Sequence, residues 1–221
     1  MKTLSICFLA LAIAFVFSAV SYGKVIELFE DSTKFIDQLS RQDTPTDIKN
    51  DNSEKYRGNI SLRLETKPGA NNGQRYNPNI PDWNYSITQN PGADTEGRWF
   101  MFAWKKVGGD GIMIQFSPNG AWGAQPNGGR YFDGNNDTGW LGIQLSKNIP
   151  ENWEVQVRDL FTDFKAFTLT GIALTQYTDV GYYDSLYLAW TEKELKDMLT
   201  KWNPVEPLDK LPTVWGEIKS K

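Results

Sequence analysis

Residues 98–116 have the sequence RWFMFAWKKVGGDGIMIQF, and this stretch determines the fold class. On both sides of its glycine-rich centre, apolar side chains occupy every second position: Phe100, Phe102 and Trp104, then Ile112, Ile114 and Phe116. A period of two is typical of a half-buried strand, because successive side chains of a strand point to opposite faces. The GGDG segment between the two runs predicts a hairpin turn.

Short runs of strand type continue along most of the chain. Further strands are predicted over residues 24–30, 59–65, 84–88, 141–145, 154–158, 167–175 and 182–190. Polar, Gly-rich and Pro-rich stretches predict loops over 41–55, 67–82 and 120–140. Because no long helical pattern lies between the strands, the sequence predicts an all-β sandwich over residues 24–190.

Two helices are expected outside this strand pattern. Asp31 and Ser32 are candidate caps for a short N-terminal helix over residues 32–40. Thr191 and Glu194 form a capping-box pair, which predicts a C-terminal helix over 191–202. Residues 203–221 contain several prolines and predict an extended tail.

The first 23 residues have the pattern of a secretory signal peptide. Lys2 precedes an apolar run over residues 4–20, and the small residues Ser21 and Gly23 suit a cleavage site. A retained membrane anchor is the alternative. Cleavage would remove Cys7, the only cysteine, and leave no membrane span. We therefore expect a secreted or periplasmic protein without disulfides, with a bacterial envelope as the favoured setting.

Composition excludes several classes of function. The chain has 221 residues, no His and one Cys, so Ser-His-Asp and Cys-His catalysis are excluded. A zinc site would have to consist of carboxylates alone, which is unusual. A net charge of −4 argues against nucleic-acid binding, which depends on neutralising phosphates.

The strand sequences also carry a family resemblance. Residues 98–106 (RWFMFAWKK), 158–164 (RDLFTDF), 167–175 (FTLTGIALT) and 183–188 (YDSLYL) resemble the galactose-binding-like, carbohydrate-binding-module-type β-sandwich domains. They are similar in particular to domains attached to large secreted proteins of planctomycete-type bacteria. The resemblance covers roughly residues 59–195. It implies a jelly-roll-like sandwich that binds a polysaccharide or glycan without catalysis, and it leaves any protein partner open.

Two rival functions remain open. A polysaccharide-degrading glycosidase needs two facing carboxyl groups, and the nearest acid pairs are Glu151 with Glu154 and Asp159 with Asp163. A lyase of sandwich fold would use a Tyr with a basic partner, for which Tyr131 beside Arg130 is the candidate. A structural or assembly protein of the cell envelope is the third possibility. The sequence favours binding over catalysis.

Residues 120–140 (GAWGAQPNGGRYFDGNNDTGW) hold the main candidates for glycan binding, because aromatic rings alternate there with amide and charged side chains. The predicted ligand-binding residues are Trp122, Arg130, Tyr131, Trp140, Lys105, Gln115, Asp133 and Asn136. Tyr131 and Arg130 are expected to be exposed, and Lys105 and Gln115 to line the same groove. Packing at the sandwich edge is the alternative for the two tryptophans. Trp83, in a predicted loop, is a second candidate platform.

A structural calcium ion is the only cofactor that the sequence suggests. Glu30 and Asp184 are its candidate ligands, because jelly-roll binding modules often hold Ca²⁺ between an early acidic loop and an acid near the last strand. The alternative is that these acids pair with Arg63 or Arg158.

Overall fold

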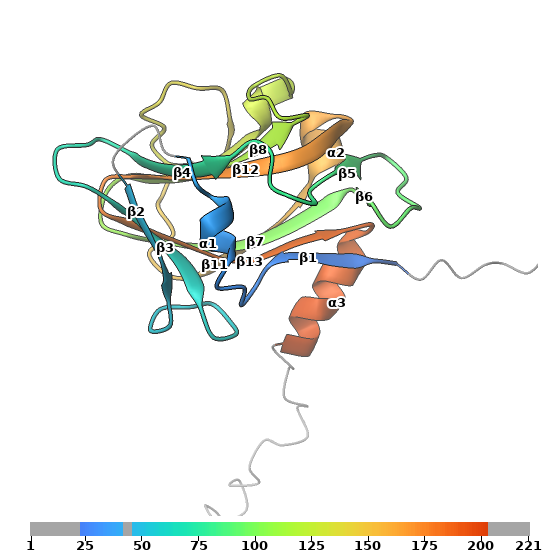
Figure 1. The fold of residues 1–221 in the computed structure, drawn as a ribbon, viewed down its shortest axis with the longest axis horizontal. Helices are drawn as coiled ribbons and strands as arrows, with labels where there is room; N and C mark the ends of the chain where they lie inside the picture. Colours follow the sequence, from blue (N-terminus) through green and yellow to red (C-terminus); the bar gives the residue numbers. More distant parts are fainter. Residues whose placement is uncertain (1–22, 42–45, 203–221) are drawn as a thin grey trace, which may run out of the picture.

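The structure is a computed structural model, and it describes residues 23–41 and 46–202. Two β-sheets lie face to face as two layers, as Figure 1 shows. The six-stranded sheet has the order β11-β7-β13-β3-β2, with β1 also on β13. The seven-stranded sheet has the order β10-β9-β8-β12-β5-β6, with β4 also on β12. The predicted all-β sandwich is therefore confirmed.

The strands of each sheet come from widely separated parts of the chain. The six-stranded sheet contains β1 (Val25–Phe29), β2 (Thr46–Asp51), β3 (Ser61–Thr66), β7 (Trp99–Val107), β11 (Glu154–Asp159) and β13 (Val180–Ala189). The seven-stranded sheet contains β4 (Gly73–Asn77), β5 (Tyr85–Ile87), β6 (Glu96–Gly97), β8 (Gly111–Pro118), β9 (Arg130–Gly134), β10 (Ile143–Ser146) and β12 (Phe167–Tyr177).

The main core fills the space between the sheets. The alternating residues that the sequence singled out face this core, and the rings of Phe100 on β7 and Phe116 on β8 meet edge to face with centroids 4.9 Å apart. The predicted hairpin over 98–116 is nevertheless wrong, because β7 and β8 lie in different sheets. Each strand needs its apolar face toward the same core, so the turn carries the chain across the gap of about 10 Å between stacked sheets.

Three strands lie where the sequence predicted loops: β2, β4 and β9. None has a clean apolar alternation, and each is fixed by pairing, β2 with β3, β4 with β12 and β9 with β8. The last two carry residues of the site described below.

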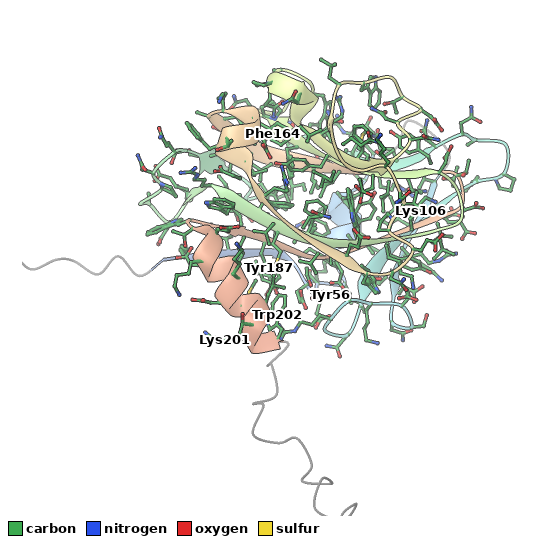
Figure 2. All side chains as sticks on the ribbon, turned by 180° about the vertical axis from the view of Figure 1, so that it is seen from behind. Tyr56, Lys106, Phe164, Tyr187, Lys201 and Trp202 are labelled. Atoms are coloured by element: carbon green, nitrogen blue, oxygen red, sulfur yellow. The ribbon has the colours of Figure 1, made fainter. Side chains whose placement is uncertain are left out.

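Helix α3 (Glu192–Trp202) confirms the predicted C-terminal helix. Thr191 N donates to Glu194 Oε2 at 2.9 Å and Glu194 N donates to Thr191 Oγ1 at 3.4 Å, which is the predicted capping box. The helix packs on the outer face of the six-stranded sheet, where Leu195 is fully buried against Met101 and Tyr187. Figures 1 and 2 show α3 beneath this sheet, with its last residue, Trp202, near Tyr187.

The other helices are short. Helix α1 (Phe35–Gln38) lies within the predicted 32–40 segment, but Asp31 does not cap it: its carboxylate accepts from the backbone N–H groups of Asn59 and Ile60. Helix α2 (Leu160–Phe164) follows β11 and is capped by Asp159, which accepts from Thr162 N. A 3₁₀ turn, η1 (Pro126–Gly129), precedes β9.

The predicted signal peptide, apart from Gly23, and the predicted tail over 203–221 lie outside the described residues. Within residues 23–41 and 46–202, no helix combines the length and apolar character that a membrane span requires.

Candidate functional site

A depression of about 300 Å³ lies on the outer face of the seven-stranded sheet. Its lining consists of aromatic, amide and guanidinium side chains: Gln74, Tyr76, Gln115, Trp122, Arg130 and Trp140. No Asp, Glu or His belongs to this lining, as far as the described part of the chain shows. Flat rings combined with amide and guanidinium groups are suited to sugar faces and hydroxyl groups.

Strand register places four of the residues in this region in one row. Tyr76 on β4 pairs with Ala173 on β12, Ala173 pairs with Gln115 on β8, and Gln115 pairs with Arg130 on β9. Neighbouring strands lie about 4.8 Å apart, so the row spans roughly 14 Å. Ala173 has the smallest side chain of the row, and its methyl group leaves space between the larger side chains on either side.

Two tryptophans from loops border this row. Trp122 is half-buried and its ring meets Tyr76 edge to face, with centroids 5.8 Å apart. Trp140 is 43% exposed, and the guanidinium of Arg130 lies 4.9 Å from the centre of its ring. Among the described residues, neither tryptophan belongs to the main hydrophobic core.

The turn before β9 brings Arg130 into position. Gly128 and Gly129 have φ angles of 63° and 65°, in the region that favours glycine. A Cβ atom at Gly128 would collide with Arg130 Nη1 and with the Leu141 carbonyl. Arg130 Nη1 donates to that carbonyl at 3.1 Å. The glycine therefore allows the guanidinium to lie against the backbone of the two adjoining loops.

Four predicted binding residues come together here: Gln115, Trp122, Arg130 and Trp140. Arg130 is only 7% exposed, so the expectation of a largely exposed side chain is wrong, although the residue reaches the depression. Gln74 and Tyr76 were missed because β4 was predicted to be a loop. No apolar alternation could have revealed them, since their strand is GQRYN.

Tyr131 lies on the other side of the sheet. It is fully buried in the main core, stacked against Phe102, and its hydroxyl donates to Asp163 Oδ2 at 2.6 Å. Burial and the Asp163 carboxylate raise the pKa of Tyr131 far above its usual range. The prediction that Tyr131 is exposed is therefore wrong, because neighbouring residues of a strand face opposite ways.

Asp133 is also fully buried on the core side of β9, which overturns its expected contact with ligand. Burial, together with the nearby Glu154 carboxylate, raises the pKa of Asp133 to about 7. Asn136 is half-exposed and is used within its own loop: it donates to the Trp140 carbonyl at 2.6 Å and accepts from Thr138 and Tyr177. It does not belong to the lining of the depression.

Lys105 does not share a groove with Gln115. It lies on β7 of the six-stranded sheet, and its Nζ forms an ion pair with Glu54 at 3.0 Å. Trp83, the second candidate platform, is 8% exposed and packs in the core against Phe35. The sequence does not show which sheet the strand of Lys105 joins. It also does not show that the loop of Trp83 folds against the core.

The acid pairs considered for catalysis lie elsewhere. Asp159 holds Arg98 through contacts of 2.6–3.0 Å, and Asp163 accepts from Tyr131 and Arg158. Glu151 and Glu154 border a separate, shallow depression of about 570 Å³. A further depression of about 720 Å³ lies beside the start of α3, where it is bordered by Trp99 and Trp190.

Glu30 and Asp184 lie close together, as the calcium prediction required, but the groups around them do not fit a calcium ion. Asp184 accepts from the backbone N–H groups of Tyr56, Arg57 and Ser185. Glu30 Oε2 accepts from the hydroxyls of Ser185 and Tyr187 at 2.9 and 3.1 Å. Calcium needs six to eight oxygen ligands, whereas these carboxylates face hydrogen-bond donors. The described residues contain no group of three or more His, Cys, Asp or Glu side chains that could hold a metal ion.

Several solved structures that are similar to this chain are carbohydrate-binding modules. A family 30 module of a cellulosomal cellulase of Clostridium thermocellum matches with 13% identity and a TM-score of 0.41, over 76% of this chain and 99% of that one. A family 29 module from Piromyces equi matches with 9% identity and a TM-score of 0.35, over 77% of this chain and 92% of that one.

A longer protein is also similar. The glycoside hydrolase domain of Endo-D from Streptococcus pneumoniae matches with 13% identity and a TM-score of 0.42. The match covers 69% of this chain but only 21% of that chain. No protein-family model matches the sequence, and no curated protein matches it. The fold assignment therefore rests on the two sheets themselves.

Proposed function

We propose that this protein binds glycan chains, without cleaving them, in the depression bordered by Trp122 and Trp140. The observation that carries the proposal is the composition of this lining. Two partly exposed tryptophans can stack on sugar rings, while Gln74, Gln115 and Arg130 offer hydrogen bonds to hydroxyl groups. Gln74, Gln115 and Arg130 lie on paired strands, which form a scaffold for the loops that carry the two tryptophans.

The absence of carboxyl groups from this lining supports binding over hydrolysis. A glycosidase needs an acid and a second carboxylate on either side of the bond that it cleaves. The secretory pattern of residues 1–23 supports a location outside the cytoplasm, secreted or periplasmic, where polysaccharides are accessible.

A glycan-array screen, followed by calorimetry on the best ligand, tests the proposal. Trp122→Ala and Trp140→Ala should each weaken binding by roughly 30-fold, because loss of a central aromatic contact costs about 2 kcal/mol. Trp153→Ala is the matched control. Trp153 is also a half-buried tryptophan, but its indole N–H donates to Glu54, which forms an ion pair with Lys105 of the other, six-stranded sheet. It should leave affinity unchanged.

Three other results would contradict the proposal. Wild-type affinity in folded Trp122→Ala and Trp140→Ala variants would move the site elsewhere. Release of reducing ends from a bound glycan would establish the enzyme alternative. Failure to bind any glycan, together with stable co-purification of an envelope protein, would favour the assembly role.

A further inference from the structure

Arg130 is a buried cation without a carboxylate partner. Only 7% of the residue is exposed, and in the part of the chain that the structure describes no Asp or Glu forms an ion pair with it. Its contacts are the Leu141 carbonyl, at 3.1 Å, and the face of Trp140. Neither contact supplies a full negative charge. The positive charge of Arg130 is thus left without a counter-ion beside the depression.

Three of the other arginines of the sandwich have carboxylate partners. Arg98 forms a forked contact with Asp159, and Arg158 lies 3.0 Å from Asp163. Arg63 lies 4.0 Å from Asp51 and also contacts Glu65. These ion pairs lie away from the depression, whereas Arg130 borders it.

Among the described residues, the buried side-chain atoms of the lining that have no hydrogen-bond partner are donors. Arg130 Nε and Gln115 Nε2 are buried atoms without a hydrogen-bond partner, and the two residues are direct neighbours across β8 and β9. Gln115 is 2% exposed. Buried donors without a partner are costly. Two adjacent unused donors, one of them charged, call for a ligand group that accepts hydrogen bonds and carries negative charge.

The protein itself does little to neutralise Arg130. Burial lowers the pKa of Arg130, and among the described residues Tyr177 opposes this change. Tyr177 cannot supply negative charge at neutral pH, because burial raises its pKa to about 12. A buried guanidinium remains charged in proteins, so an anion that approached it would offset more of its desolvation than the carbonyl and the ring do.

We infer that the glycan bound here is acidic, and that a sugar carboxylate or sulfate group forms an ion pair with Arg130 and accepts from Gln115. The inference rests on the proposed function, since it concerns the same site. It narrows the ligand from glycans in general to uronate-containing or sulfated polysaccharides. Arginine suits this role because its planar fork matches both oxyanions. The net charge of −4 places the selectivity in this local pair rather than in the field of the whole molecule.

The test compares acidic oligosaccharides with neutral forms of the same sugars by calorimetry on the purified protein. The carboxylate arm uses tetragalacturonate and its methyl ester. The sulfate arm uses a sulfated galactan oligosaccharide and its desulfated form. In at least one arm the acidic form should bind tenfold or more tightly, and the arm that responds identifies the oxyanion. This preference should decline with added salt.

Variants then assign the preference to Arg130. Arg130→Gln should abolish the preference between acidic and neutral forms, while Arg130→Lys, which keeps the charge without the fork, should retain part of it. Arg63→Gln removes the same charge from the six-stranded sheet and should retain the full preference. Circular dichroism and thermal midpoints confirm that each variant is folded.

The outcomes separate this inference from the proposed function. Neutral forms bound as tightly as acidic forms, or array hits confined to neutral glycans, would overturn the inference and leave glycan binding intact. A full acidic preference in folded Arg130→Gln would overturn the role of Arg130. Binding to no glycan in the array or in either arm would overturn both.

Discussion

Arg130 and Tyr131 are neighbours in the chain, yet they serve opposite faces of the seven-stranded sheet. Arg130 reaches the outer depression, and Tyr131 is buried in the core. The sequence suggested both as ligand contacts because residues 120–140 were expected to form a loop, in which both side chains could face a ligand. Because residues 130–134 form strand β9, neighbouring side chains point to opposite faces, and only Arg130 can face a ligand on the outer side.

The same alternation buries Asp133, and this gives a prediction for the pH dependence of stability. Its pKa is raised from 3.8 to about 7, so the folded state holds this proton more tightly than the unfolded state does. Its contribution to stability is complete below about pH 4 and is lost as the pH rises through about 7. Asp133→Asn removes this dependence. As the pH rises from 4 to 8, the free energy of unfolding of the variant should increase by roughly 4 kcal/mol relative to that of wild type.

Urea unfolding at the two pH values measures this difference. Glu154→Gln is the companion variant: it removes a carboxylate that raises the pKa of Asp133, so part of the wild-type pH dependence should disappear. If the free energy of unfolding changed with pH in the same way for wild type and Asp133→Asn, Asp133 would not titrate in this range.

At the level of elements, the sequence predicted the strands that have a clear apolar pattern and missed those that are fixed by pairing. The strands β7, β8, β12 and β13 have apolar alternation or long apolar runs, and α3 has a capping box, so local patterns suffice. By contrast, β4 (GQRYN) consists of Gly and polar residues apart from one Tyr, and becomes a strand through its ladder with β12. Tertiary pairing overrides strand propensity there. Four of the six residues that line the site were predicted, and Gln74 and Tyr76 were not.

Helix α3 gives a prediction that separates stability from binding. Leu195 is fully buried against the outer face of the six-stranded sheet, away from the depression on the other sheet. Leu195→Ala should lower the free energy of unfolding by about 2–5 kcal/mol. Glycan affinity should stay at the wild-type value wherever the variant is folded.

Lys193→Ala is the matched control on the same helix. It removes an exposed pair with Asp197 and should change stability by no more than about 0.5 kcal/mol. A loss of glycan affinity in folded Leu195→Ala would show that the two sheets are coupled, or that the ligand reaches the α3 side of the molecule.

Across the whole molecule, the two outer faces of the sandwich are used differently. Helix α3 covers part of the six-stranded sheet (Figure 1). The outer face of the seven-stranded sheet carries the depression instead. Within the six-stranded sheet, strand β13 contains a bulge between Asp184 and Tyr187. Ser185 within this bulge has a φ of 52°, which is unusual for a residue with a side chain.

Glu30 and Asp184 stabilise this bulge through hydrogen bonds, which leads to a prediction about metal removal. Ser185 donates its N–H to Asp184 at 2.7 Å and its hydroxyl to Glu30 at 2.9 Å. Because hydrogen-bond donors contact both carboxylate oxygens of Asp184 and Oε2 of Glu30, we expect EDTA to leave the thermal midpoint unchanged, with elemental analysis confirming that calcium is absent. An ion that bound only the folded state would stabilise it by mass action, by about 2.7 kcal/mol at a concentration 100 times its Kd. A midpoint that fell with EDTA, recovered with Ca²⁺ and lost this response in Asp184→Asn would therefore restore the calcium site and contradict the hydrogen-bonded arrangement.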